Sequence, residues 1–209
     1  MSFSTTYVDE TGRSREVSIS DSDSHEALRN DYNALMKTYN PKYVTIERLQ
    51  AAPGEELHLR VTVHAPSHYL TSSNTTNPQP CSSMSVEVAA CLGYPLKSVS
   101  AWYPKDRFLA SPNVFRSGKA CIDRWIPFKS SLLTVVEKLV MDMIHNPVVT
   151  RYDSMANSSV EDWHKKNAAK HLFPTMKPKL LYAVNLTPLP PRRTAAVVPA
   201  PQPLPPRRR

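Results

Sequence analysis

Residues 57–65, LHLRVTVHA, alternate strictly between apolar and polar side chains. In an extended chain successive side chains point to opposite faces, so Leu57, Leu59, Val61 and Val63 would share one face. The polar residues between them would share the other face. This pattern predicts an antiparallel strand with one face in the core and one in water.

The segments on either side of 57–65 extend this strand into a sheet. The dipeptide Pro53-Gly54 predicts a turn just before it. The stretch TSSNTTNPQP at 71–80 predicts a loop, because its residues are polar or proline. Further apolar runs predict strands at 43–49, 86–91 and 99–103.

Helical patterns lie before and after the predicted strands. Asp23-Ser24-His25-Glu26 has the spacing of a capping box, and apolar residues follow at helical intervals, which predicts a helix over 24–38. A second helix is predicted from Leu132 to Ile144, and a third over 158–172, capped by Ser158 or Ser159. We therefore expect an α+β fold: an N-terminal helix, a four-stranded antiparallel meander and C-terminal helices, with the helices on one face of the sheet.

The two ends of the chain differ in composition from the middle. Residues 1–22 are polar, which fits either disorder or a small hairpin around residues 10–13. Beyond Lys179 the chain is rich in proline, arginine and alanine, and we do not expect it to pack. These differences predict a polar extension (1–22), a folded domain (23–175) and a disordered tail (176–209).

Charge and cysteine content limit the classes of function. The net charge is +8, but residues 188–209 hold five arginines and no acid, so the folded domain carries little of the excess. We therefore expect neither nucleic acid nor a membrane as a partner. The three cysteines form no CxxC pair, which argues against a disulfide framework and a zinc knuckle. No secretory signal is visible at the N-terminus, and we expect a cytoplasmic protein.

Cys121 lies in the segment SPNVFRSGKACIDRWIP (111–127), which has no predicted helix or strand. It has three interpretations: a packed core residue, a metal ligand or a nucleophile. Asp123 is the one ligand-type neighbour, which is a weak metal signal. No signature of a cysteine hydrolase surrounds the residue, and that class would need a histidine within reach. Cysteine is among the residues most often buried in proteins, and this alone favours a packed cysteine.

The spacing of several motifs changes that preference. Tyr94-Pro95 precedes Asn113, Cys121 follows Asn113 by eight residues, and Trp125-x-Pro127 follows the cysteine. Over residues 24–172 this order resembles the core of ubiquitin-conjugating enzymes. That family has an HPN tripeptide with the catalytic cysteine eight residues after its asparagine, and then a W-x-P motif. Gly118 also stands where the family commonly has a glycine.

The chain departs from the family pattern in three places. Ser111 replaces the motif histidine, which braces the loop, and the serine could do so by hydrogen bonding to the backbone. Ile122 replaces leucine, and the interval from Cys121 to Trp125 is shorter than in the typical eukaryotic enzyme. These departures favour a divergent member, of the kind found beside bacterial antiphage or ubiquitin-like operons.

The resemblance implies an acyltransferase that carries a ubiquitin-like protein as a thioester on Cys121 and transfers it to an amine. Asn113 would stabilise the oxyanion, and Asp153 is the nearest acid that could activate the acceptor. No metal or cofactor is implied. The implied partners are the ubiquitin-like protein, its activating enzyme, and a ligase or substrate protein. The residues that would brace the site are Tyr94, Pro95, Ser111, Pro112, Trp125 and Pro127.

An alternative is an inactive member of the same fold that acts as an adaptor through its tail. The sequence PLPPRR occurs at 188–193 and at 203–208, and fits the P-x-x-P-x-R pattern that proline-binding domains recognise. A plain basic extension also explains this composition. Residues 188–209 would then attract acidic partners only weakly.

Overall fold

A computed structural model describes residues 2–8, 11–122, 125–150 and 156–183. Strand β4 (Glu55–Val63) has the alternation that its sequence predicts. Leu57, Leu59, Val61 and Val63 are buried, whereas His58 and Arg60 are partly exposed. One face of this strand therefore belongs to the core and the other to the surface.

The main sheet has four antiparallel strands in the order β3-β4-β7-β8. The strands beside β4 are β3 (Val44–Leu49), β7 (Met84–Cys91) and β8 (Ser100–Trp102). Val61 lies opposite Ile46 on one side and Val86 on the other, so apolar residues align across the sheet. The predicted four-stranded antiparallel sheet is confirmed, within one to two residues at most strand ends.

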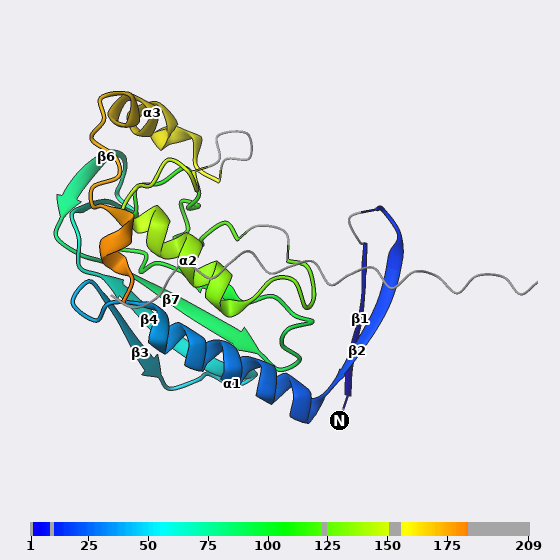
Figure 1. Ribbon diagram of the computed structural model, residues 1–209. Coiled ribbons are helices and arrows are strands. Elements are labelled where there is room, and N and C mark those ends of the chain that lie inside the picture. The colour runs from blue at the N-terminus through cyan, green and yellow to red at the C-terminus, as the bar shows by residue number, and fades with distance from the viewer. Residues whose placement is uncertain (1, 9–10, 123–124, 151–155, 184–209) are drawn as a thin grey trace, which may run out of the picture.

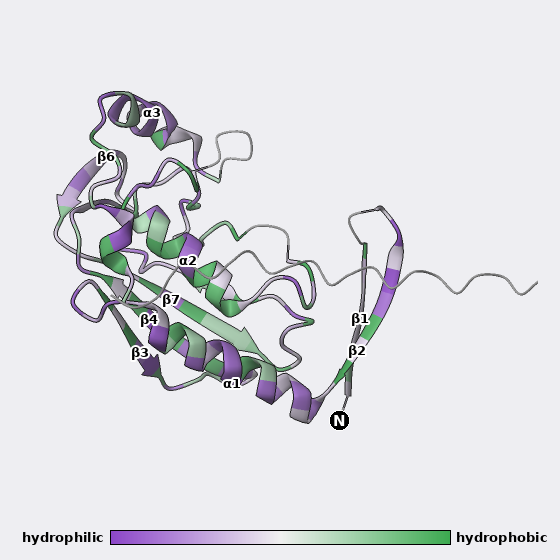
Figure 2. Ribbon diagram, in the orientation of Figure 1, coloured by the Kyte–Doolittle hydropathy of each residue, from purple (hydrophilic) through white to green (hydrophobic). Residues whose placement is uncertain are grey.

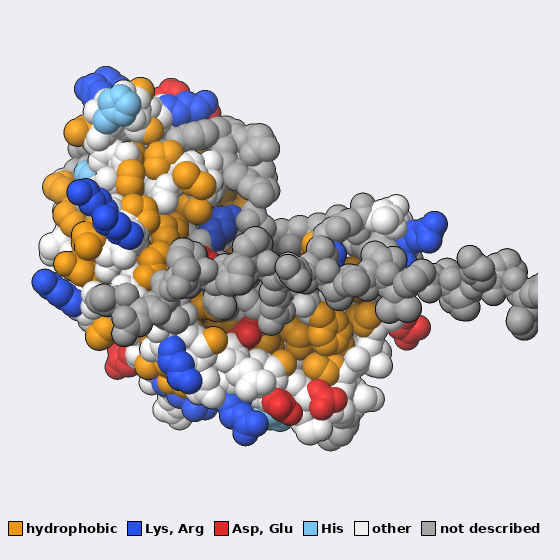
Figure 3. Space-filling view, viewed as in Figure 1, with side chains coloured by type: hydrophobic (Ala, Val, Ile, Leu, Met, Phe, Trp, Pro, Cys, Tyr) orange, Lys and Arg blue, Asp and Glu red, His pale blue; other side chains and the backbone are white. Residues whose placement is uncertain are grey.

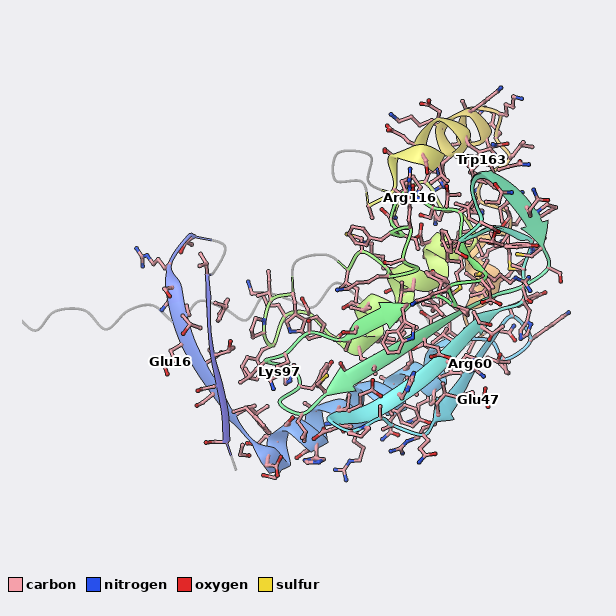
Figure 4. The ribbon with its side chains drawn as sticks, turned by 180° about the vertical axis from the view of Figure 1, so that it is seen from behind. Glu16, Glu47, Arg60, Lys97, Arg116 and Trp163 are labelled. Carbon is pink, nitrogen blue, oxygen red and sulfur yellow. The ribbon has the colours of Figure 1, made fainter. Side chains whose placement is uncertain are left out.

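Two helices, α1 (Asp21–Thr38) and α2 (Leu132–Met143), cover one face of this sheet (Figure 1). Figure 2 shows hydrophobic stretches in β7 and along both helices, as expected for elements that share a core. Seen from behind, the other face carries polar side chains such as Glu47 and Arg60 (Figure 4). An oxygen of Glu47 lies 3.6 Å from a guanidinium nitrogen of Arg60. The α+β class and the one-sided covering of the sheet agree with the sequence.

Serine hydroxyls cap both helices. Ser20 caps α1, where its hydroxyl accepts a hydrogen bond from the backbone N–H of Asp23. The helix therefore begins at Asp21, before the predicted capping box, and the proposed cap at residue 23 is wrong. Ser131 and Thr134 form a reciprocal capping box at the start of α2.

A second sheet corrects the predicted loop over 71–80. Strand β5 (Ser67–Thr71) pairs with β6 (Asn74–Cys81) and with the short β9 (Phe108–Leu109). Because β6 is an edge strand of this sheet, its prolines need not donate hydrogen bonds on the outer side. Edge position explains how a segment with the composition of a loop forms a strand.

The N-terminal residues form a hairpin, which settles the choice between disorder and a hairpin. Strand β1 (Ser2–Val8) pairs with β2 (Ser14–Ser20). Figure 1 shows the hairpin projecting from the body at the start of α1. The ring of Phe3 lies against Gly93, and the amine of Lys97 lies 5.8 Å from the centre of that ring. These contacts connect the hairpin to the loop between β7 and β8.

The third helix is shorter than predicted. A 3-10 turn, η1 (Ser158–Val160), leads into α3 (Glu161–Ala169), so the helix ends three residues before 172. The side chain of Asn157, not Ser158 or Ser159, accepts the capping hydrogen bond, which comes from the backbone of Ser159. Leu172, at the predicted end of the helix, is 56 % exposed.

The folded domain continues past the predicted boundary at residue 175. A 3-10 turn, η2 (Pro178–Leu181), places Leu181 in the core with no exposed surface. Tyr182 pairs with Tyr39, and the backbone N–H of Ala183 donates to the carbonyl of Thr38 at 3.0 Å. The expectation that residues beyond Lys179 do not pack is therefore wrong for Leu180–Ala183. Residues 184–209, with both PLPPRR repeats, lie outside the described part of the chain.

No helix in the described residues is both long and apolar enough to cross a bilayer.

Candidate functional site

The segment 113–121 folds back on itself, so that Asn113 and Cys121 face each other. The backbone N–H of Cys121 donates to the carbonyl oxygen of Asn113 at 2.7 Å. Val114 and Ala120 pair as an isolated antiparallel bridge just inside this contact. The interval of eight residues from Asn113 to Cys121 therefore forms a closed loop that brings the cysteine backbone back to the asparagine.

Gly118 makes this turn possible. Its φ is +85°, a conformation that side chains disfavour. A Cβ atom at this position would lie 2.6 Å from the carbonyl oxygen of Tyr103. The backbone N–H of Tyr103 donates to the Gly118 carbonyl at 2.8 Å, which fixes the turn against the chain that follows β8.

Ser111 stabilises the loop that carries Asn113. Its hydroxyl accepts a hydrogen bond from the backbone N–H of Asn113 at 3.1 Å and donates to the carboxylate of Asp142 at 2.8 Å. The hydrogen bond from Ser111 to the backbone that the sequence suggested is therefore present. The carbonyl of Pro112 accepts from the backbone N–H groups of Ala156 and Asn157, at 2.9 and 3.1 Å.

The side chain of Asn113 is buried, and its amide faces inward. Its Nδ2 donates to Asp142 Oδ1 at 3.2 Å and to the carbonyl oxygen of Val149 at 3.4 Å. The asparagine is 4 % exposed. In this conformation the amide holds the loop to α2 and to the chain after α2.

Asp142 is a residue of the site that the sequence did not indicate. It lies on the last turn of α2 and is almost completely buried. Burial raises the pKa of its carboxyl group to about 6, although the hydrogen bonds from Ser111 and Asn113 act in the opposite direction. A single acid in the apolar run LVMDMI was the available signal, since buried carboxylates need partners.

Cys121 itself is partly exposed and lines a pocket of about 210 Å³. The Nζ of Lys138 lies 3.4 Å from the carbonyl oxygen of Cys121 and donates to it. The described residues that line this pocket include no histidine. The pocket therefore gives no support to the cysteine-hydrolase alternative, which needs a histidine within reach of the thiol. The lining residues are Cys121, Ile122, Trp125, Lys129, Ser130, Thr134, Val135, Lys138 and Leu139.

Trp125 connects the cysteine pocket to the Tyr94-Pro95 motif. Its indole N–H donates to the Pro95 carbonyl at 2.8 Å, and its ring centre lies 5.8 Å from that of Tyr94. The Tyr94 hydroxyl donates to the carboxylate of Asp31 and accepts from the backbone N–H of Leu132 at 2.8 Å. These contacts support the scaffolding role expected of both motifs.

The remaining predicted residues separate into three groups. Pro127 is buried, as a brace would be. Asp123 and Asp153 lie outside the described residues. Cys81 and Cys91 lie at the ends of β6 and β7 and line no part of the Cys121 pocket.

No protein-family model matches the sequence, and no curated protein matches it either.

Proposed function

We propose that this chain is a conjugating enzyme for a ubiquitin-like protein, with Cys121 as the thioester carrier. The observation that carries the proposal is the turn from Asn113 to Cys121, which brings a partly exposed thiol beside the asparagine loop. The four-stranded sheet, its helical layer and the contact between Trp125 and Pro95 are consistent with a ubiquitin-conjugating arrangement.

The first step would be a thiol exchange. The Cys121 sulfur attacks the carbonyl carbon of a thioester on the activating enzyme, and the activating enzyme's thiolate leaves. One carbon–sulfur bond forms as another breaks, so the step is nearly isoenergetic and depends mainly on positioning. The described residues that line this pocket include no histidine base. Such a pocket suits the exchange, because a thiolate is already a good nucleophile.

The second step would be aminolysis of the thioester. An acceptor amine attacks the carbonyl carbon, a carbon–nitrogen bond forms, the Cys121 thiolate leaves and the amine loses a proton. Negative charge develops on the carbonyl oxygen, and an amide donor nearby would stabilise it. Asn113 supplies that donor if its side chain leaves Asp142; otherwise it acts by holding the loop.

The hydrogen bonds of Asn113 also favour a second candidate, an inactive module of the same fold. The residue is 4 % exposed, and its amide already donates to Asp142 and Val149. An asparagine fixed in this way would maintain the loop without contributing to transfer. The two candidates differ in whether Cys121 accepts an acyl group at all.

The deciding experiment incubates the full chain with ATP, ubiquitin or a bacterial ubiquitin-like protein, and the matching activating enzyme. An active enzyme gives an adduct on non-reducing gels that dithiothreitol removes. The adduct should vanish in Cys121→Ala and persist in the matched controls Cys81→Ala and Cys91→Ala. If an activating enzyme charges its own modifier but never this chain, the inactive module is the better description.

A further inference from the structure

Three side chains with metal-binding groups converge where the first turns of α1 meet β4. One ligand atom from each of Asp21, His25 and Glu56 lies within 4.8 Å of the other two. Asp21 and His25 are four residues apart on one helix face, and Glu56 reaches them from the strand. Figure 3 shows acidic side chains gathered at the lower edge of the molecule, over these turns of α1.

Glu56 is the unusual member of this cluster. Its side chain is 7 % exposed, yet neither carboxylate oxygen takes part in a hydrogen bond within the described residues. It lines a pocket of about 590 Å³ together with His25. A buried carboxylate without hydrogen bonds is costly, so its retention calls for a positive charge nearby. That charge is either a protonated His25, with Arg29 and Arg48 in the lining of the same pocket, or a bound cation.

His25 is oriented toward Glu56 as a metal ligand would be. Its Nδ1 lies 2.7 Å from the backbone carbonyl oxygen of Asp21, so this nitrogen carries the proton and donates it. The Nε2 lies 3.2 Å from Glu56 Oε1, which is the distance of an ion pair when His25 is protonated. A carbonyl that fixes the histidine tautomer is the usual outer contact of a metal-bound histidine.

The separation of the two ligand atoms fits a metal ion between them. Two ligands on a tetrahedral zinc ion, each at 2.0–2.1 Å, are about 3.3 Å apart. The Nε2–Oε1 distance of 3.2 Å is close to this value. When His25 is neutral and no cation is bound, two lone pairs face each other across that distance.

We propose that Asp21, His25 and Glu56 bind a divalent transition metal ion of the zinc type. One nitrogen and two carboxylate ligands suit such an ion, and water would complete the coordination. The ion would fasten the first turns of α1 to β4 and has a structural role. This site is independent of Cys121 and of the proposed transfer activity.

The test is a calorimetric titration of the full chain with zinc chloride, after metal removal with EDTA. Cys81, Cys91 and Cys121 are replaced by serine in every sample, so that thiols do not bind the ion. The expected result is one zinc per chain, with affinity reduced at least tenfold in Glu56→Gln and in His25→Gln. His58→Gln is the matched control, because His58 also lies between two carboxylates but donates a hydrogen bond from Nε2 to the Glu87 carboxylate.

Thermal unfolding with and without zinc separates the metal site from a simple ion pair. A metal site predicts that zinc raises the midpoint of the parent chain and not of Glu56→Gln. Circular dichroism verifies that each variant folds. The proposal is wrong if zinc does not bind or if both variants bind zinc as tightly as the parent does. It is also wrong if the difference in unfolding midpoint between parent and variant is the same with and without zinc.

Discussion

The backbone N–H of Cys121 and the carbonyl of Asn113 form a hydrogen bond of 2.7 Å that closes the turn of the candidate site. This contact fixes the cysteine backbone, while the asparagine side chain is held separately by Asp142 and Val149. Position of the thiol and availability of the amide are therefore distinct properties, which mutations can separate.

Replacing Asn113 tests its part in transfer. If the enzyme is active and the amide stabilises the oxyanion, Asn113→Ala should form the thioester normally and discharge it to free lysine about 100-fold more slowly. Single-turnover discharge assays measure both steps. Asn33→Ala, on the exposed side of α1, is the control. Loss of charging by a folded Asn113→Ala protein would contradict the oxyanion role.

Gly118→Ala should destabilise the domain, because the added Cβ meets the Tyr103 carbonyl at 2.6 Å and the φ of +85° is strained. The expected cost is ~2–4 kcal/mol from strain and overlap together. Urea unfolding measures it. Gly54 has a similar φ of +87° but nothing within 4 Å, so Gly54→Ala should cost only about 1 kcal/mol. Equal costs would show that the contact with Tyr103 is unimportant.

Asp142 should make stability depend on pH. Its raised pKa means that the folded protein holds this proton more tightly than the unfolded chain does. Its contribution to stability is therefore largest below pH 3.8 and is lost as the pH rises through about 6. Asp142→Asn should be more stable than the wild type at pH 7.5, by on the order of 1–3 kcal/mol, and the difference should shrink in acid.

Urea titrations at several pH values test this, with exposed Asp106→Asn as a control that should change little. If Asp142→Asn is less stable than the wild type at pH 7.5, the hydrogen bonds that the Asp142 carboxylate accepts outweigh the cost of burying its charge.

A buried histidine pair should act in the opposite sense. Burial lowers the pKa of His164 to about 4 and the pKa of His145 well below its usual value. Both remain neutral in the folded protein while the unfolded chain takes up protons, so stability should fall as the pH drops from 6.5 toward 4. His164→Phe should lose less stability over this range than the wild type. The exposed His171→Gln variant should follow the wild type, and a His164→Phe profile that also does so would refute the assignment.

Leu181 tests where the folded domain ends. Leu181→Ala should lower the free energy of unfolding by ~2–5 kcal/mol, because the side chain has no exposed surface. Its neighbour Leu180 is 40 % exposed, so Leu180→Ala should have a much smaller effect. If the two substitutions had similar effects, the folded domain would end at residue 175, as the sequence predicts.

Much of this architecture could be predicted from the sequence because local pattern decided it. The alternation in β4 and the apolar spacing in α2 each require one buried face, whatever the rest of the chain does. Strand β6 escaped prediction because its prolines are tolerated only through its place at a sheet edge. Leu181 escaped because a short apolar pair among prolines and lysines has no periodicity.

The candidate site was predictable only where its residues are close in sequence. Asn113, Gly118 and Cys121 belong to one turn, so their spacing carried the information. Asp142 contributes across 29 residues to Asn113, and only the fold brings the two together. The cluster of His25 and Glu56 was not predicted for the same reason: the two residues are far apart in sequence and only the fold brings them together.

The Tyr94 hydroxyl has a mechanical consequence for the Cys121 pocket. It is bonded to Asp31 on α1 and to the first backbone N–H of α2, while Trp125 is bonded to the adjacent Pro95. Trp125 in turn forms one wall of the pocket. A force that displaces α1 relative to α2 must therefore either break these hydrogen bonds or shift that wall, so strain applied on the helical layer reaches the thiol.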